Sequence, residues 1–166
     1  MPLTRTYDVR PISPEVVAEL QTLDDLGHAP TLVVDAEGGS PLRCCLRAAR
    51  PGERLLLVSY APLRRWAATR GAEPVAYDEV GPVFIHPTEC DGPTAGGWPD
   101  DLRGTPRVLR AYDDNGRTIG GTLIGDDDDP EAAVDELLVN ERVALVHARA
   151  VIYGCFTFAI EPRRSR

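Results

Sequence analysis

The sequence predicts an α+β domain in which a mainly antiparallel sheet of hairpins carries about two packed helices. Three observations indicate this fold: strand-like runs come in pairs joined by short turns, two segments carry apolar residues at helical spacing, and no repeat or linker divides the chain. A length of 166 residues suits one core, because single domains cluster near about 100 to 150 residues. We therefore expect one domain over residues 1–166, frayed at 163–166.

The first expected elements are a strand at Tyr7–Ile12 and a helix directly after it. Ser13 precedes Pro14, and a serine cap with a proline in the first turn is typical of a helix start. The apolar face of this helix is formed by Val16, Val17, Leu20 and Leu23.

Strand-like runs follow at Thr31–Val34, Leu42–Ala49 and Arg54–Tyr60. Arg50–Glu53 separates the last two runs and contains a Pro-Gly pair, which suits a tight turn. The sequence therefore predicts that residues 42–49 and 54–60 pair as a hairpin.

The middle of the chain is less regular. A short helix is expected at Trp66–Ala68, ending before Pro74, and Val83–His86 is typical of a buried strand. Pro87–Gly104 is rich in glycine, proline and aspartate. Because an irregular loop longer than about 12 to 15 residues is uncommon in a compact domain and is usually functional or disordered, this loop is a candidate lid.

A hairpin is expected around Asn115-Gly116, between strands at Arg107–Tyr112 and Arg117–Ile124, because Asn-Gly is a strong turn signal. A helix follows the acidic run Asp126–Asp129 and extends to about Asn140. We assign the acidic run a structural role, because it favours the helix dipole and lacks the ligand spacing of a calcium loop.

The last two strands, Val143–Ala150 and Cys155–Ile160, form a hairpin that brings chemically capable side chains together. Strand alternation places His147 and Arg149 on one face and separates Cys155 from Phe156 and Phe158, whose face is expected in the core. An imidazole and a guanidinium near a thiol can lower its pKa and make Cys155 a nucleophile. The alternative is that Cys155 is buried and inert.

A second candidate lies at His86 and Cys90, whose spacing suits metal ligation at a strand end, with His147 or Cys155 completing a tetrahedral zinc site. A hydrogen-bonded structural histidine is the alternative. The neighbouring Cys44 and Cys45 are expected to point to opposite faces of a strand, which disfavours a disulfide between them.

Composition and charge argue against several kinds of partner and of chemistry. A net charge of -8 and a pI near 4.9 disfavour nucleic-acid binding, which needs a clustered basic surface. All 18 basic residues are arginine, which excludes lysine Schiff-base chemistry. No apolar run has the length of a signal peptide or membrane helix, so we expect a cytoplasmic protein with reduced thiols and no membrane partner.

Several short segments of the chain also stand in an order and spacing that resemble those of one known family. They are Cys44–Arg47, Pro51–Glu53, Leu57–Tyr60, Gly81–His86 with Cys90, Leu109–Tyr112, Asn115–Arg117, His147–Arg149 and Tyr153–Phe156. Together they resemble domain of unknown function 1203, a family of bacterial proteins of about this length. The resemblance spans nearly the whole chain except Arg64–Gly71 and Gly92–Asp101; it implies a single-domain bacterial protein and no particular reaction.

Two hypotheses of function follow. The first is a small-molecule enzyme or binding protein for an anionic metabolite, with no cofactor and with an oligomeric state that the sequence leaves open. Its candidate catalytic residues are His86, His147 and Cys155, and its candidate substrate-binding residues are Arg47, Arg110, Arg149 and Tyr60. The second is a non-catalytic structural or interaction protein with a His/Cys zinc site.

Overall fold

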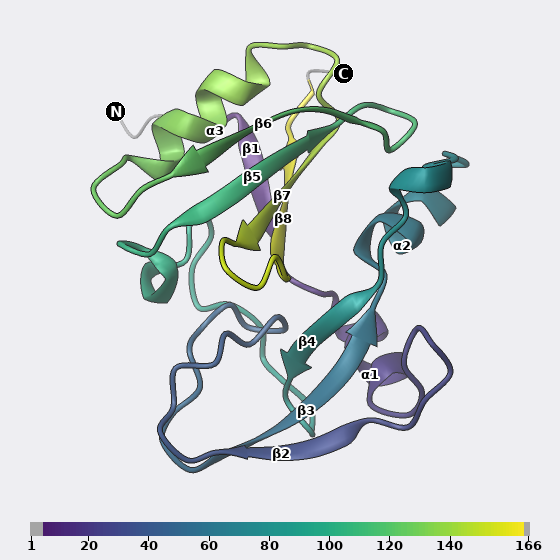
Figure 1. Ribbon diagram of the computed structural model, residues 1–166, viewed down its shortest axis with the longest axis vertical. Helices are drawn as coiled ribbons and strands as arrows, with labels where there is room; N and C mark the ends of the chain where they lie inside the picture. The colour runs from purple at the N-terminus through teal and green to yellow at the C-terminus, as the bar shows by residue number, and fades with distance from the viewer. Residues whose placement is uncertain (1–4, 165–166) are drawn as a thin grey trace.

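The computed structural model describes residues 5–164 and shows two antiparallel sheets with three helices, which confirms the predicted α+β class (Figure 1). The larger sheet has the strand order β1-β8-β7-β5-β6 and the smaller sheet the order β2-β3-β4. The helices are α1 (Pro14–Leu20), α2 (Pro62–Ala68) and α3 (Pro130–Leu138). The strands are β1 (Tyr7–Arg10), β2 (Thr31–Asp35), β3 (Glu53–Tyr60), β4 (Gly81–Ile85), β5 (Arg107–Tyr112), β6 (Thr118–Ile124), β7 (Leu145–Ala150) and β8 (Phe156–Pro162).

The larger sheet contains both hairpins that the sequence predicted in the C-terminal third, β5–β6 and β7–β8. Helix α3 lies over one face of this sheet (Figure 1). Asp129 caps the helix by accepting hydrogen bonds from the N–H groups of Glu131 and Ala132, which agrees with the structural role assigned to the acidic run. The main core residues between the layers are Leu109, Val134, Val146, Ala148, Phe158 and Ile160.

The smaller sheet packs its own core against α1, and Ser13 caps that helix as predicted. Leu55 and Val58 of β3 meet Val17 and Leu20 of α1 in this core. Within residues 5–164, no helix has the length and apolar character needed to cross a membrane.

A β-bulge in the β7–β8 hairpin corrects the predicted aromatic face. The register shifts between Ala148 and Arg149, so Ala148 pairs with Phe158 while Arg149 pairs with Phe156. The extra residue breaks the two-residue alternation of side chains. Phe158 therefore packs in the core of the larger sheet and Phe156 in the core of the smaller one, and β8 joins the two.

The predicted hairpin of residues 42–49 with 54–60 is wrong. Strand β3 pairs with β2 and β4 instead, so its two edges are already occupied. Residues 41–48 form a closed loop with a bridge between Pro41 and Ala48, and Leu46 adopts a positive φ of 60°. The chain turns away from β2 because the Asp35 carboxylate accepts hydrogen bonds from the N–H groups of Gly38 and Ser40.

The described part of the C-terminal tail is anchored. Arg163 pairs with Asp8 at 2.6 Å, and its backbone N–H donates to the carbonyl oxygen of Thr6. Arg164 pairs with Asp114. Ser165 and Arg166, for which fraying was also expected, lie outside the described residues.

Candidate metal centre

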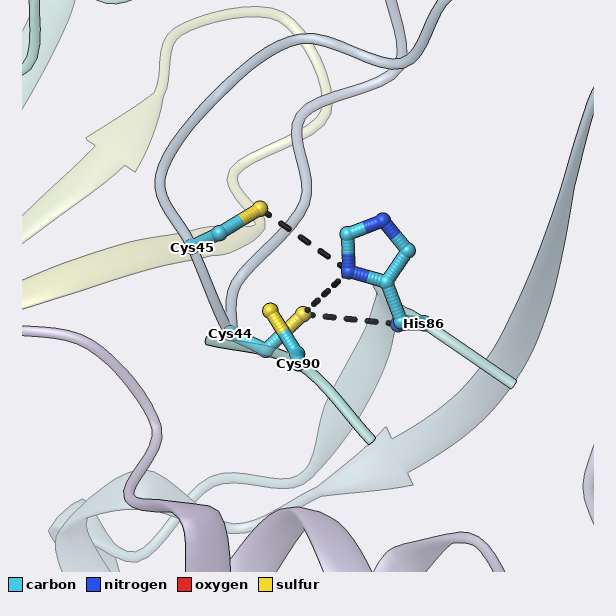
Figure 2. A group of neighbouring side chains, drawn as sticks. All are labelled: Cys44, Cys45, His86 and Cys90. Carbon is cyan, nitrogen blue, oxygen red and sulfur yellow. Dashed lines mark hydrogen bonds between the residues drawn. The ribbon is translucent and has the colours of Figure 1, made fainter. Parts of the chain in front are cut away.

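The loop of residues 41–48 places Cys44 and Cys45 beside the same imidazole (Figure 2). The sequence predicted that their side chains point to opposite faces of a strand. That prediction is wrong, because the two cysteines lie in a turn. The sulfur of Cys44 lies 3.2 Å from Nδ1 of His86, and the sulfur of Cys45 lies 3.9 Å from the same atom. One imidazole nitrogen therefore faces two thiols.

Cys90 completes a group of four ligands. One donor atom from each of Cys44, Cys45, His86 and Cys90 lies within 4.8 Å of all the others. A tetrahedral zinc ion with Zn–S near 2.3 Å and Zn–N near 2.0 Å requires about 3.8 Å between sulfurs and about 3.6 Å from sulfur to nitrogen. The donors are thus within about 1 Å of a tetrahedral zinc shell.

The four ligands come from two short pieces of chain that tertiary packing brings together. Cys44 and Cys45 belong to the 41–48 loop, whereas His86 directly follows β4 and Cys90 lies in the loop after it. The pairing of His86 with Cys90 was predicted, but Cys44 and Cys45 stand in the places expected for His147 or Cys155. The signal in the sequence was the adjacent cysteine pair, which the strand assignment used only to argue against a disulfide and did not place beside His86 and Cys90.

A carboxylate orients the histidine. Nε2 of His86 lies 3.1 Å from Oε1 of Glu53, and Arg47 donates to both oxygens of Glu53. The Arg47 guanidinium, whose Nη2 also lies 3.0 Å from Nε2, holds the pKa of this carboxyl well below its usual range, so ionised Glu53 can accept a proton from Nε2. In the tautomer with the proton on Nε2, the lone pair of Nδ1 faces the sulfurs, which is the arrangement found around metal-bound histidines.

The two neighbouring thiols differ in acidity. A hydrogen bond from the Cys44 thiol lowers the pKa of Cys45 to about 6, and the same bond together with burial raises the pKa of Cys44. The backbone N–H of His86 also donates to the Cys44 sulfur at 3.4 Å. A thiolate is therefore favoured at Cys45, and thiolates are the form that binds metal.

Two cavities are lined in part by members of this group of four ligands. Cys45 and Arg47 line one of about 510 Å³, whose opposite wall is the 93–103 segment. Cys44 and Cys90 line another, of about 490 Å³, beside α1. The loop predicted as a lid thus supplies Cys90 and a cavity wall, and its Trp98 is buried in the core of the larger sheet.

The residues predicted to form a pocket near the last two strands lie away from the cysteine group, and the structure does not bring all of them together. Tyr60, Arg149 and Cys155 line a cavity of about 280 Å³, whereas His147 is not among its lining residues. His147 is 1% exposed and packs edge-on between the rings of Tyr112 and Phe156.

The carboxylate of Glu79 joins the two predicted arginines near this cavity. Nη1 of Arg110 lies 2.9 Å from Oε1 of Glu79, and Nη2 of Arg149 lies 2.9 Å from Oε2. Glu79 was not predicted as a site residue, because it follows an irregular segment with no periodic pattern. Arg47 and His86 lie at the cysteine group instead, and His147 is buried in the core, so the seven residues named from the sequence do not form one site.

Buried His147 is expected to make the protein less stable as the pH falls below about 6.5. Burial, and then the positive charges of Arg149 and Arg110, hold the pKa of His147 well below 6.5. Below that pH the unfolded chain binds a proton that the folded chain does not, so the free energy of unfolding falls by up to about 1.4 kcal/mol per pH unit.

Urea unfolding of the wild type and of His147→Gln, from about pH 7.5 to pH 5, measures this contribution. The variant should lose less stability over the interval. All other titrating groups are common to both proteins, so equal slopes would contradict the assignment to His147.

Comparison with known proteins gives one match. A family model described as "Protein of unknown function (DUF1203)" matches residues 39–162. The matched range includes all four ligands of the candidate metal centre and the Glu53–Arg47 pair behind His86. No curated protein and no solved structure matches the chain significantly.

Proposed function

The chain belongs to the DUF1203 family, and we propose that this member binds one Zn²⁺ ion through Cys44, Cys45, His86 and Cys90. The observation that carries the proposal is the convergence of three sulfurs and one imidazole nitrogen within 4.8 Å. A nucleophilic cysteine needs only one thiol beside its histidine. Three thiolates and one imidazole are instead a common ligand set of structural zinc.

The proposed role of the metal is structural. Four protein ligands fill a tetrahedral shell, whereas catalytic zinc sites keep one position open for water or substrate. The ion would add a link between the 41–48 loop and the end of β4, which the Leu42–Phe84 bridge and the hydrogen bond from the N–H of Arg43 to the carbonyl oxygen of Phe84 also join. Metal binding then becomes part of the folding free energy of the smaller sheet.

Metal analysis of the native protein tests the proposal directly. Purification under reducing conditions without chelator should give one zinc per chain, measured by mass spectrometry of the elements. Cys90→Ser should lose the metal, whereas the matched control Cys155→Ser should keep it, because Cys155 lies outside the ligand group. A reduced, folded wild type that neither carries zinc nor takes it up from solution would exclude the site.

Glu53→Gln is expected to weaken zinc affinity by about 10- to 100-fold without changing the stoichiometry, because it removes the carboxylate that orients His86. Competition with a chromophoric chelator measures the affinity. Glu131→Gln is the control, since it neutralises a carboxylate that is also paired with an arginine, Arg103, but lies outside the ligand group. Equal affinities of the two variants would show that Glu53 does not act on the metal.

We also propose that the cavity at Tyr60, Arg149 and Cys155 binds a small anionic molecule. The supporting observation is that three of the residues expected to bind or transform an anionic metabolite line the same cavity. Arg149 is nearly buried there, and the carboxylate that pairs with it belongs to Glu79, whose side chain is exposed and can give way to another anion. The proposal covers binding alone, because His147 is buried among aromatic rings and His86 lies in the cysteine group.

A further inference from the structure

We infer that a small carboxylate binds at this cavity in the position now held by the Glu79 carboxylate, between Arg110 and Arg149. The inference rests on the proposed anion-binding function and names its ligand class. Arg110 donates a hydrogen bond from Nη1 to Oε1 of Glu79 at 2.9 Å, and Nη2 of Arg149 forms an ion pair with Oε2, also at 2.9 Å. This is the geometry in which two arginines hold a planar carboxylate.

Burial makes Glu79 the replaceable partner of the pair. The Arg149 side chain is 9% exposed, and a charge at that depth is costly without a counter-ion. The Glu79 side chain is 47% exposed, so its carboxylate can return to water at small cost. The buried cation is therefore permanent, while the anion that neutralises it can be exchanged.

The rest of the site is fixed around Arg149. Its Nη1 donates to the carbonyl oxygen of Gly154 at 2.9 Å, which leaves Nη2 directed at the carboxylate. Burial raises the pKa of Tyr60 to about 12, so the cavity presents a neutral phenol rather than a second anion. A volume of about 280 Å³ suits a ligand smaller than drug-sized molecules.

The thiol of Cys155 in the same cavity provides a site-specific reporter. Iodoacetate and iodoacetamide have the same size and reaction, but only iodoacetate carries a carboxylate. In both reactions the sulfur bonds to the methylene carbon, iodide leaves with the bonding electrons, and the thiol proton passes to solvent. Peptide-resolved mass spectrometry follows Cys155 separately from the three other cysteines.

The quantity measured is the rate of Cys155 alkylation by iodoacetate divided by that by iodoacetamide, each relative to the unfolded chain. Glu79→Gln removes the negative charge between the two arginines, so the carboxylate of iodoacetate can take its place. The ratio should rise about tenfold over the wild type, which corresponds to one charge-assisted hydrogen bond. Adding Arg110→Gln to Glu79→Gln should reverse most of the increase. Arg110 is chosen because its side chain is one-third exposed, so its replacement spares the fold better than that of buried Arg149.

Glu131→Gln, away from the cavity, controls for the change in net charge. A preference for iodoacetate that is already high in the wild type and unchanged in Glu79→Gln would overturn the inference while leaving anion binding intact. No preference in any variant, with no protection of Cys155 by millimolar propionate, would overturn both the inference and the proposed anion-binding function.

Discussion

Removal of zinc is expected to lower the free energy of unfolding by about 4 kcal/mol or more when the free zinc concentration exceeds the Kd by a thousandfold. For a chain of this size that loss corresponds to a fall in Tm of about 10 °C. The reason is that ligand atoms from the 41–48 loop and from residues 86–90 meet only in the folded protein, so the metal binds the native state and not the unfolded one.

The effect should be confined to one part of the molecule. The 41–48 loop is closed by few hydrogen bonds of its own, whereas β7 lies between β5 and β8 and pairs with both. Hydrogen exchange after chelation should therefore accelerate at residues 41–48 and 86–91 and remain slow in β7.

Thermal unfolding with and without a chelator, under reducing conditions, measures the loss of stability. Cys90→Ser should start from the lower Tm and be insensitive to the chelator, while Cys155→Ser should respond as the wild type does. A wild-type Tm that chelation leaves unchanged would show that the cysteine group holds no stabilising metal.

Phe158→Ala is expected to destabilise the protein by about 3 to 5 kcal/mol, the usual cost of removing a fully buried aromatic ring. Phe158 is 0% exposed in the core of the larger sheet. Its ring meets that of Trp98 edge-on at 5.0 Å, and it lies opposite Ala148 on β7, whose small side chain cannot fill the space left behind.

Urea unfolding of the two proteins gives the difference in free energy. Phe158→Leu serves as the matched control and should cost clearly less, because it keeps an apolar side chain of similar reach. A loss below about 1 kcal/mol in Phe158→Ala would mean that the core collapses around the cavity, contrary to its close packing.

Local patterns explain why much of the fold was predictable. Asn115-Gly116 specifies a turn whatever surrounds it, so the β5–β6 hairpin was predicted correctly. Ser13 and Asp129 cap their helices through bonds to residues two or three positions away, and such contacts depend only on neighbouring sequence. The pairing of the final two strands followed from their short connection in the same way.

The mistaken assignments share a non-local cause. Residues 42–49 have the composition of a strand, but both edges of β3 are taken by β2 and β4, which sequence spacing does not reveal. The bulge beside Arg149 moved Phe156 and Phe158 into different cores, and one inserted residue is enough to reverse a period of two.

The same division holds for the candidate sites. The sequence by itself determined an acidic, lysine-free α+β chain in which His86 and Cys90 can share a metal, because composition and short spacing are local properties. Only the tertiary structure decided that Cys44 and Cys45 join them, and that Glu79 lies between Arg110 and Arg149. Ligand groups of this kind depend on contacts between segments tens of residues apart, and these contacts follow from how the strands pair and how the chain turns between them.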